Sequence, residues 1–462
     1  MTLDSYAAVL SRREEILKRS TGIEFAAFEH QGIGFDYEAL MSQVELSIEE
    51  IAQIQRASAV GNTPLIELHN ITQLIRNHSK PGYGARIFVK DEAGNPSGSF
   101  KDRRASLSAS YAKKYGYRGM IAATSGNYGA AVASQAAHYG LDAIIIQEVF
   151  DSGGIGQPEI LEKTRKCEAL GAEVLQTSVG PELFFALLKT LDETGYFNAS
   201  LYTPFSIVGI ETLGVEIAEQ TRAVTGAHPT VVLATHAGGG MVTGTARGLR
   251  KAGANDTKVV GVSVDLSGLH MASDTDFNRK SFTTGHTGFS LPFTSWPDRA
   301  DVPRNAARSL RYLDELLLVT QGEVFFTTEL LSRIEGLERG PAGNTSLAAA
   351  IALSRRMQAD EVIVVSETEY TGAGKSPVSQ LAFAETNGVD VAVGPREEDI
   401  PGKTIRLPAR IEDIETRSFD LNRVRKSYLK KIDQSRPLES DDYAFLAEDV
   451  NLPVEEVKRR LR

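Results

Sequence analysis

The sequence contains very little cysteine. Cys167 is the only cysteine among 462 residues, so no disulfide can form within the chain. It lies in a helix-like segment, residues 163–170, that offers neither a histidine nor a glycine-rich loop to activate a thiolate. We therefore do not expect Cys167 to be catalytic.

Long apolar runs and an excess of positive charge are also missing. No stretch approaches the ~18 apolar residues of a membrane span, and the first residues lack the basic and apolar regions of a signal peptide. Lys and Arg number 50 against 60 Asp and Glu, a net charge of −10, which argues against nucleic acids and anionic membranes as partners. No metal-ligand spacing occurs. These absences predict a cytoplasmic protein without a resident metal.

What the chain does contain is an alternation of strands and helices. At 462 residues it is long enough for two domains, or for one large domain with appendages. Short apolar runs predict six strands, at residues 86–90, 120–124, 143–147, 230–234, 259–264 and 361–365. Because helical stretches separate them, the sequence predicts an α/β fold with mainly parallel, helix-flanked sheets.

One lysine stands at the start of a predicted helix. Lys101 follows the turn Asn95-Pro-Ser-Gly and opens a helical stretch at residues 101–114. A helix N-terminus and local burial both lower the pKa of such an amine, which favours the neutral form that reacts with an aldehyde cofactor. A lysine in a turn is more often a solvated surface residue, so this interpretation depends on the rest of the site.

A second junction is suited to a carboxylate. The predicted strand at residues 120–124 leads into Ser125, Gly126 and Asn127, which open an alanine-rich helix at residues 130–139. Free N–H groups at a helix start bind anions, and the side-chain amide of Asn127 suits a phenolate oxygen.

A third junction is suited to a phosphate. The strand at residues 230–234 is followed by Gly238, Gly239 and Gly240 at the start of another helix. Three glycines let backbone amides surround a phosphate with no side chain in the way. Helix–sheet packing also selects glycine, so the triplet alone leaves a structural role open.

Together these segments resemble the fold-type-II pyridoxal-phosphate enzymes, which include cysteine synthase, threonine synthase and the tryptophan synthase beta subunit. Five blocks carry the resemblance in the family's chain order: residues 60–65, 95–103, 124–129, 237–244 and 340–346. The resemblance implies pyridoxal 5′-phosphate as the cofactor and Lys101 as the catalytic lysine that binds its aldehyde as a Schiff base.

The resemblance also assigns the other site residues. Besides Lys101, it implies that the cofactor is bound by Asn127, at the ring hydroxyl, and by a phosphate cup of Ala237, Gly238, Gly239, Gly240 and Met241. It implies that the substrate is bound by Thr124, Ser125, Gly126, Asn127 and Tyr128.

The partner of the cofactor's ring nitrogen is expected after the strand at residues 361–365. In this family a hydroxyl at that place leaves the pyridine nitrogen unprotonated and favours chemistry at the substrate's β-carbon. Ser366 is the first candidate and Thr368 the second. The neighbouring carboxylate of Glu367 is a rival, and it would protonate the nitrogen.

The domain organisation follows from the same resemblance. We expect an N-terminal helical extension at 1–58, a large cofactor-binding domain at 59–104 and 211–400 with an insertion at about 265–323, a small domain at 105–210, and a C-terminal helical appendage at 401–462.

Three local features refine this organisation. In the N-terminal extension Ser47 and Glu50 have the spacing of a helix capping box. From Asp441 the chain has the pattern of two short helices separated at Leu452-Pro453. The insertion contains His270 and His286, which are candidate acid–base groups or hydrogen-bonded structural histidines.

The insertion, the segment 366–375 and the N-terminal extension resemble one subgroup of the family, the beta subunits of the thiolases that act on 2-amino-4-oxopentanoate. This implies a C-acyltransferase that converts 2-amino-4-oxopentanoate and coenzyme A to D-alanine and acetyl-CoA, or catalyses the reverse condensation. It also implies a small alpha subunit as partner, and we expect homodimerisation. Two alternatives stay open: β-replacement or β-elimination on an activated serine or threonine, as in cysteine synthase or threonine synthase, and a non-catalytic partner subunit.

Overall fold

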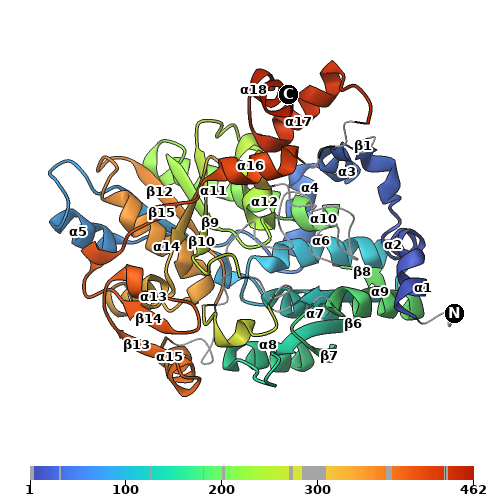
Figure 1. Cartoon of the computed structure of the whole chain (residues 1–462), viewed down its shortest axis with the longest axis horizontal. Helices are drawn as coiled ribbons and strands as arrows, with labels where there is room; N and C mark the ends of the chain where they lie inside the picture. The colour runs from blue at the N-terminus through green and yellow to red at the C-terminus, as the bar shows by residue number, and fades with distance from the viewer. Residues whose placement is uncertain are drawn as a thin grey trace.

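The computed structural model describes residues 5–30, 33–124, 126–180, 182–199, 203–269, 274–283, 309–370, 377–430, 432 and 435–462. Within these ranges the chain forms two main sheets flanked by helices, and helices from both ends of the chain pack beside them (Figure 1). This is the expected α/β arrangement.

The larger sheet has seven strands in the described residues, in the order β15-β11-β10-β9-β12-β4-β3. The five central strands run parallel, while β3 and β15 pair antiparallel at the two edges. The strands are β3 (Leu65–Glu67), β4 (Arg86–Asp91), β9 (Val231–Thr235), β10 (Lys258–Val264), β11 (Glu315–Val319), β12 (Val362–Glu367) and β15 (Arg417–Ser418).

Each face of this sheet is covered by its own helices. Along β12, Val362 and Val364 belong to the apolar core shared with α11 (Glu211–Thr225) and α12 (Gly240–Lys251). The alternate residues Ile363 and Val365 belong to the core on the other face, shared with α5 (His69–Asn77), α13 (Gln321–Glu335) and α14 (Pro341–Ser354). A strand buried on both faces is expected to be a continuous apolar run, as this one is.

The smaller sheet has four described strands in the order β7-β6-β5-β8, and all its pairs are parallel. Its strands are β5 (Gly119–Thr124), β6 (Asp142–Phe150), β7 (Glu173–Ser178) and β8 (Phe197–Asn198). Its helices are α6 (Lys101–Lys114), α7 (Asn127–Tyr139), α8 (Pro158–Ala169), α9 (Glu182–Thr194) and α10 (Pro204–Val208). All six predicted strands are confirmed, and the helix predicted at 101–114 is α6 with the same bounds.

The N-terminal segment contains α1 (Tyr6–Ser11), α2 (Arg13–Thr21), η1 (Phe25–Phe28), β1 (Glu29–His30), β2 (Gly34–Phe35), α3 (Tyr37–Ser42) and α4 (Ile48–Ala57). The predicted capping box is confirmed, because Ser47 accepts from the Glu50 N–H and Glu50 accepts from the Ser47 N–H. The α2 helix is tied to α9 by the salt bridge between Arg19 and Asp192, at 2.6 Å.

The C-terminal segment contains α15 (Pro377–Thr386), β13 (Asp390–Val393), β14 (Thr404–Leu407), β15, α16 (Leu421–Leu429), α17 (Ser440–Val450) and α18 (Val454–Leu461). The two predicted final helices are confirmed as α17 and α18. The expectation that 401–462 is helical misses β14 and β15, which are too short for their periodicity to be recognised. The domain limits themselves stay predictions.

The N-terminal and C-terminal segments meet near α16, although the two termini lie apart (Figure 1). The ring of His30 stacks on that of Phe445 at a centroid distance of 4.5 Å, and His30 also pairs with Asp442 at 3.2 Å. Figure 1 shows the C-terminal helices, in red, next to α3 and β1, in blue. Among the described helices, none has the length and apolar composition needed to cross a bilayer.

Candidate active site

Lys101 lies where α6 begins, against the carboxyl end of β12. The loop before it follows the segment after β12, since the Phe100 N–H donates to the Thr368 carbonyl at 3.1 Å and the Tyr370 N–H to the Gly98 carbonyl at 2.8 Å. The Lys101 side chain is half-buried, and its Nζ lies 4.8 Å from the centroid of the Phe100 ring. Lys101 is therefore placed beside the strand end that was expected to carry the ring-nitrogen partner.

The three residues after Lys101 are charged and buried. Asp102, Arg103 and Arg104 are 0%, 0% and 2% exposed. The Asp102 carboxylate accepts from the Ser97 N–H at 2.7 Å and from the Gln135 side-chain amide at 3.5 Å. Burial raises the pKa of Asp102 to about 7, against the opposing effect of these hydrogen bonds. Asp102 thereby joins the loop before Lys101 to α7.

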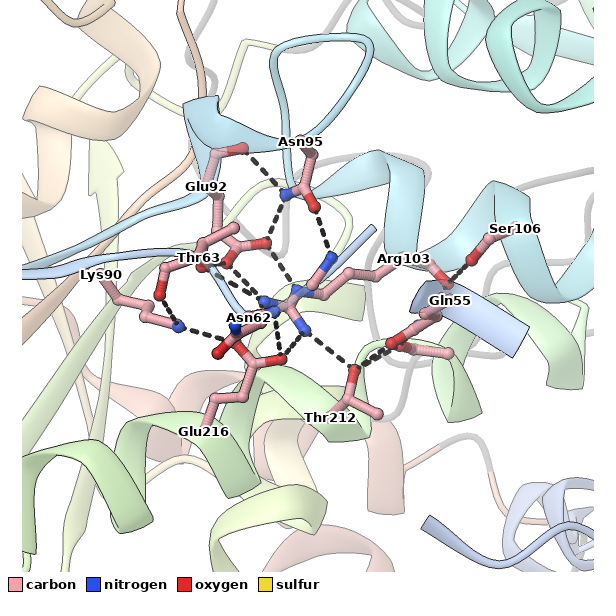
Figure 2. Close-up of polar contacts among 12 residues, drawn as sticks. Gln55, Asn62, Thr63, Lys90, Glu92, Asn95, Arg103, Ser106, Thr212 and Glu216 are labelled. Carbon is pink, nitrogen blue, oxygen red and sulfur yellow. Dashed lines mark hydrogen bonds and ion pairs between the residues drawn. The ribbon is translucent and has the colours of Figure 1, made fainter. Parts of the chain in front are cut away.

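Arg103 binds two carboxylates at once (Figure 2). Its guanidinium donates to both oxygens of Glu92, at 2.7 and 2.8 Å, and to both oxygens of Glu216, at 2.8 Å each. It also donates to the Thr212 hydroxyl at 3.0 Å. Burial disfavours the charge on Glu216, but Arg103 and Lys90 outweigh it and lower the pKa of Glu216 to about 2.

Lys90 is the second cation of this network. Its ammonium donates to Glu216 at 2.7 Å, to the Thr63 carbonyl at 2.6 Å and to Gln220 at 2.9 Å. Burial lowers the pKa of Lys90, and the nearby carboxylates oppose that effect. Two cations and two carboxylates balance, so the interior carries no net charge here, which a buried site requires.

The first of the five sequence blocks, residues 60–65, supports the Lys101 loop. The Gly61 N–H donates to the Asn95 side chain at 2.9 Å, and the Thr63 hydroxyl donates to Glu92 at 2.6 Å. Asn95 in turn donates to Glu92 at 2.9 Å. The block thus lies beside the turn that precedes Lys101.

The glycine triplet forms the start of α12. Gly239 has a φ of +88°, and α12 begins at Gly240. Ala237 and Gly238 are half-buried, while Met241 is buried. The first amides of a helix have no partner inside it and favour an anion. A side chain at Gly239 would place its Cβ only 2.6 Å from the Ser309 hydroxyl oxygen, so the loop has room for glycine alone.

Two residues that the sequence did not single out lie behind this loop. His236 is 1% exposed, and its Nε2 lies 2.7 Å from the Ser309 hydroxyl. Burial lowers the pKa of His236 to about 4, so the imidazole is neutral at neutral pH. Ser309 belongs to the expected insertion, whereas His270 and His286 lie outside the described residues. A histidine two positions before three consecutive glycines was the available signal.

The candidate substrate loop joins β5 to α7. The Gly126 N–H donates to the Thr124 hydroxyl at 3.0 Å, and α7 begins at Asn127, which is half-buried. Ser125 lies outside the described residues. Tyr128 is buried at 2% exposed, and the Arg104 guanidinium lies 4.0 Å from its ring centroid. The Tyr128 side chain therefore packs in the interior, against Arg104.

Side chains alternate between the two faces of β12, so the two candidate partners of the ring nitrogen, Ser366 and Glu367, lie on opposite faces. Ser366 continues the face of Val364, toward α11 and α12, whereas Glu367 continues the face of Val365, toward α14. A Cβ at Gly343 of α14 would lie 1.7 Å from a Glu367 carboxylate oxygen. Burial and then the nearby Asp91 raise the pKa of Glu367 well above its usual range.

Two buried hydroxyls at the end of β12 could form hydrogen bonds with a bound group. Ser366 and Thr368 are 0% and 4% exposed, and neither hydroxyl has a hydrogen-bond partner within the described part of the chain. A buried hydroxyl is normally hydrogen-bonded. With the left-handed turn at Gly239, these hydroxyls fit a bound group that has a phosphate and a heterocyclic ring.

Cys167 lies in the apolar core beside the smaller sheet. It is 0% exposed, and a Cβ at Gly129 of α7 would be 3.3 Å from its sulfur. Burial raises the pKa of the thiol to about 12. A thiol in this environment does not supply a thiolate at neutral pH.

Comparison with known proteins identifies the class. Residues 57–369 match the model of the family described as pyridoxal-phosphate dependent enzyme. The chain belongs to this family, its cofactor is pyridoxal phosphate, and its fold is that of the fold-type-II enzymes. A hydrogen sulfide-producing enzyme from Fusobacterium nucleatum has the same fold, with a TM-score of 0.54 and 23% identity over 68% of this chain and 96% of its own.

Two curated relatives are similar over their whole length. A 2-amino-4-ketopentanoate thiolase beta subunit from an unknown prokaryotic organism is 60% identical over 99% of this chain and 98% of its own. A protein of the same name from Acetoanaerobium sticklandii is 57% identical over 99% and 98%. 2-Amino-4-ketopentanoate is another name for 2-amino-4-oxopentanoate.

The first prediction tests the phosphate cup by comparing Gly239→Ala with Gly226→Ala. Both glycines have left-handed backbones, with φ of +88° and +85°, but only at Gly239 does a Cβ collide with a neighbour. The strain costs each variant about 1–2 kcal/mol of stability. We expect only Gly239→Ala to weaken cofactor binding, by at least about tenfold or about 1.4 kcal/mol. An absorbance titration of the apoenzyme measures this. Equal affinity in both variants and the wild type would place the phosphate elsewhere.

The second prediction is that Cys167→Ala retains most of the activity and all of the bound cofactor. The sulfur is packed in the core, so we expect a stability loss of about 1 kcal/mol, measured by denaturant unfolding. A folded Cys167→Ala enzyme that holds its cofactor but has no activity would require an acyl-cysteine in the reaction.

Proposed function

We propose that the chain is the beta subunit of a pyridoxal-phosphate-dependent thiolase. It uses coenzyme A to cleave 2-amino-4-oxopentanoate into D-alanine and acetyl-CoA, or catalyses the reverse condensation. The observation that carries this proposal is the 60% and 57% identity to two thiolase beta subunits along almost the entire chain. Similarity of that extent includes the N-terminal and C-terminal segments that lie outside the family match at 57–369.

The arrangement of side chains supports a role for each region. Lys101 holds the cofactor aldehyde and then moves a proton at the substrate's α-carbon with its Nζ. The amides from Ala237 to Met241 hold the phosphate at the start of α12. The loop from Thr124 to Tyr128 holds the substrate carboxylate, which orients the bond to be broken. Asn127 binds the ring hydroxyl.

Ser366 is our choice for the ring nitrogen. Its buried hydroxyl lies on the α12 face of β12, the face from which the phosphate cup begins, whereas Glu367 lies on the α14 face. A serine hydroxyl does not protonate a pyridine nitrogen, so the bound ring stays a moderate electron sink. This matches cleavage next to the β-carbon.

The acyl transfer balances without an enzyme thiol. The thiolate of coenzyme A attacks the C4 ketone, the C3–C4 bond breaks, and C3 takes the electron pair and then a proton. The bound cofactor supplies the delocalisation that stabilises this electron pair. The acetyl group leaves on coenzyme A, and the remaining carbon skeleton is alanine. The burial of Cys167 is consistent with this route.

The relatives are named as beta subunits, and we propose that this chain likewise assembles with a small alpha subunit. We also propose that it forms a homodimer and works in the cytoplasm. Assays should therefore be run with and without a candidate alpha subunit.

The third prediction concerns Lys101. Borohydride reduction of the holoenzyme followed by peptide mapping should place the label on Lys101. Lys101→Ala should fold normally, because one half-buried amine adds little to the core, yet lose all turnover. Lys114→Ala, at the exposed end of the same helix, serves as the control and should keep activity. A label on another lysine would contradict the assignment.

The reaction itself is tested by the products. With 2-amino-4-oxopentanoate and coenzyme A, the enzyme should release acetyl-CoA and alanine in equal amounts. Release of pyruvate or 2-oxobutanoate from activated serine or threonine, without acetyl-CoA formation, would indicate β-elimination instead. A holoenzyme inactive in both assays with the alpha subunit present would indicate a non-catalytic subunit.

A further inference from the structure

The N-terminal segment reaches the catalytic helix through one buried glutamine. Gln55 lies in the last turn of α4, two residues before the family match begins at residue 57, and it is 1% exposed. Its side-chain amide donates to the Arg103 carbonyl at 3.1 Å and to the Gly209 carbonyl at 2.7 Å. One amide thus bridges α6 to the residue that follows α10.

The acceptor end of the same side chain joins the charge network around Arg103. The Thr212 hydroxyl of α11 donates to the Gln55 oxygen at 2.6 Å, and the Arg103 guanidinium donates to that hydroxyl at 3.0 Å. Figure 2 shows Gln55 and Thr212 on the side of Arg103 opposite Asn95 and Glu92. The backbone and the side chain of Arg103 are therefore both held.

These contacts act on the first turn of α6, two residues after Lys101. The side chain of Arg103 is tied to Glu92 after β4 and to Glu216 of α11, while its carbonyl is tied to Gln55 of α4. Anchors in three directions leave a helix turn little freedom to rotate or shift. The direction of the Lys101 side chain depends on that turn, because the Cα–Cβ vector is set by the backbone.

A purely stabilising role explains this arrangement poorly. Removing an arginine and two glutamates from water is unfavourable, and a protein with apolar residues of similar volume in their place is often as stable. Such a network does supply a defined geometry, since bidentate pairs restrict both distance and angle. Small errors of placement at a reacting group are costly, of the order of 10²-fold in rate for about 1 Å.

We propose that Gln55 is a positioning residue for Lys101, acting through the backbone and side chain of Arg103. The N-terminal segment is then part of the framework of the active site, although it lies outside the part of the chain shared by the family. This inference rests on the proposed role of Lys101 as the cofactor lysine.

The test compares Gln55→Met with Ser47→Ala in the same helix. Gln55→Met keeps a similar volume and removes all three hydrogen bonds of the side chain. Ser47→Ala breaks the capping box of α4, and the hydrogen bonds that it removes involve neither Arg103 nor Thr212. If destabilising α4 were enough to slow cofactor attachment, both variants would show the slowing.

Two readouts on the apoenzyme separate positioning from general stability. One is the rate at which pyridoxal phosphate attaches covalently to Lys101, followed by absorbance and borohydride trapping. The other is the affinity for 4-deoxypyridoxine 5′-phosphate, which has the ring and the phosphate but no aldehyde. We expect Gln55→Met to slow attachment by about tenfold or more with unchanged affinity for the analogue, and Ser47→Ala to change neither.

Attachment at the wild-type rate in folded Gln55→Met overturns the proposal, and so does an equal slowing in Ser47→Ala. If Gln55→Met does not fold, Thr212→Val replaces it, because it removes the hydroxyl that links the Arg103 guanidinium to the Gln55 oxygen. A wild-type label on a lysine other than Lys101 would contradict the proposed function, which distinguishes that failure from this one.

Discussion

The double bidentate ion pair of Arg103 is the interaction on which the candidate site depends. Burying one guanidinium is unfavourable by itself, and only two fully aligned carboxylates, from Glu92 and Glu216, make it possible. Those carboxylates come from the segment after β4 and from α11, so the ion pair brings together the carboxyl end of β4, a helix that covers the larger sheet and the start of α6. Lys90 balances the remaining charge.

From this point the first turn of α6 connects the two halves of the molecule. Arg103 faces the larger sheet, Asp102 holds the preceding loop and α7, and Arg104 lies over Tyr128 and donates to Ser206 of α10 at 2.7 Å. Three consecutive charged side chains thus bind three different parts of the structure. Lys101, next to them in the chain, is half-buried beside the end of β12.

Much of the site was predictable because its parts are local. Lys101 at a helix start, the Gly238–Gly240 turn and the loop around Asn127 are each encoded within a few residues, by turn chemistry and the switch from strand to helix periodicity. The choice between Ser366 and Glu367 was not predictable in this way. Both follow the same buried strand, and only the helices packed on each face distinguish them.

Contacts between residues far apart in the chain could not be predicted from the sequence. The pairs His236 with Ser309 and Gln55 with Arg103 join residues 73 and 48 positions apart. The periodicity of a helix does not indicate which residue a single buried polar side chain will contact. It does not indicate the packing of Tyr128 against Arg104 either.

The sequence by itself determined the class of fold, the cofactor family and the lysine expected to bind the cofactor, because strand alternation and backbone turns depend on neighbouring residues. Only the tertiary structure decided which buried charges neutralise one another, which of Ser366 and Glu367 lies on the α12 face of β12, and how the N-terminal segment reaches α6. Those properties depend on desolvation and on hydrogen bonds across the fold, which exist only once the sheets and helices have packed.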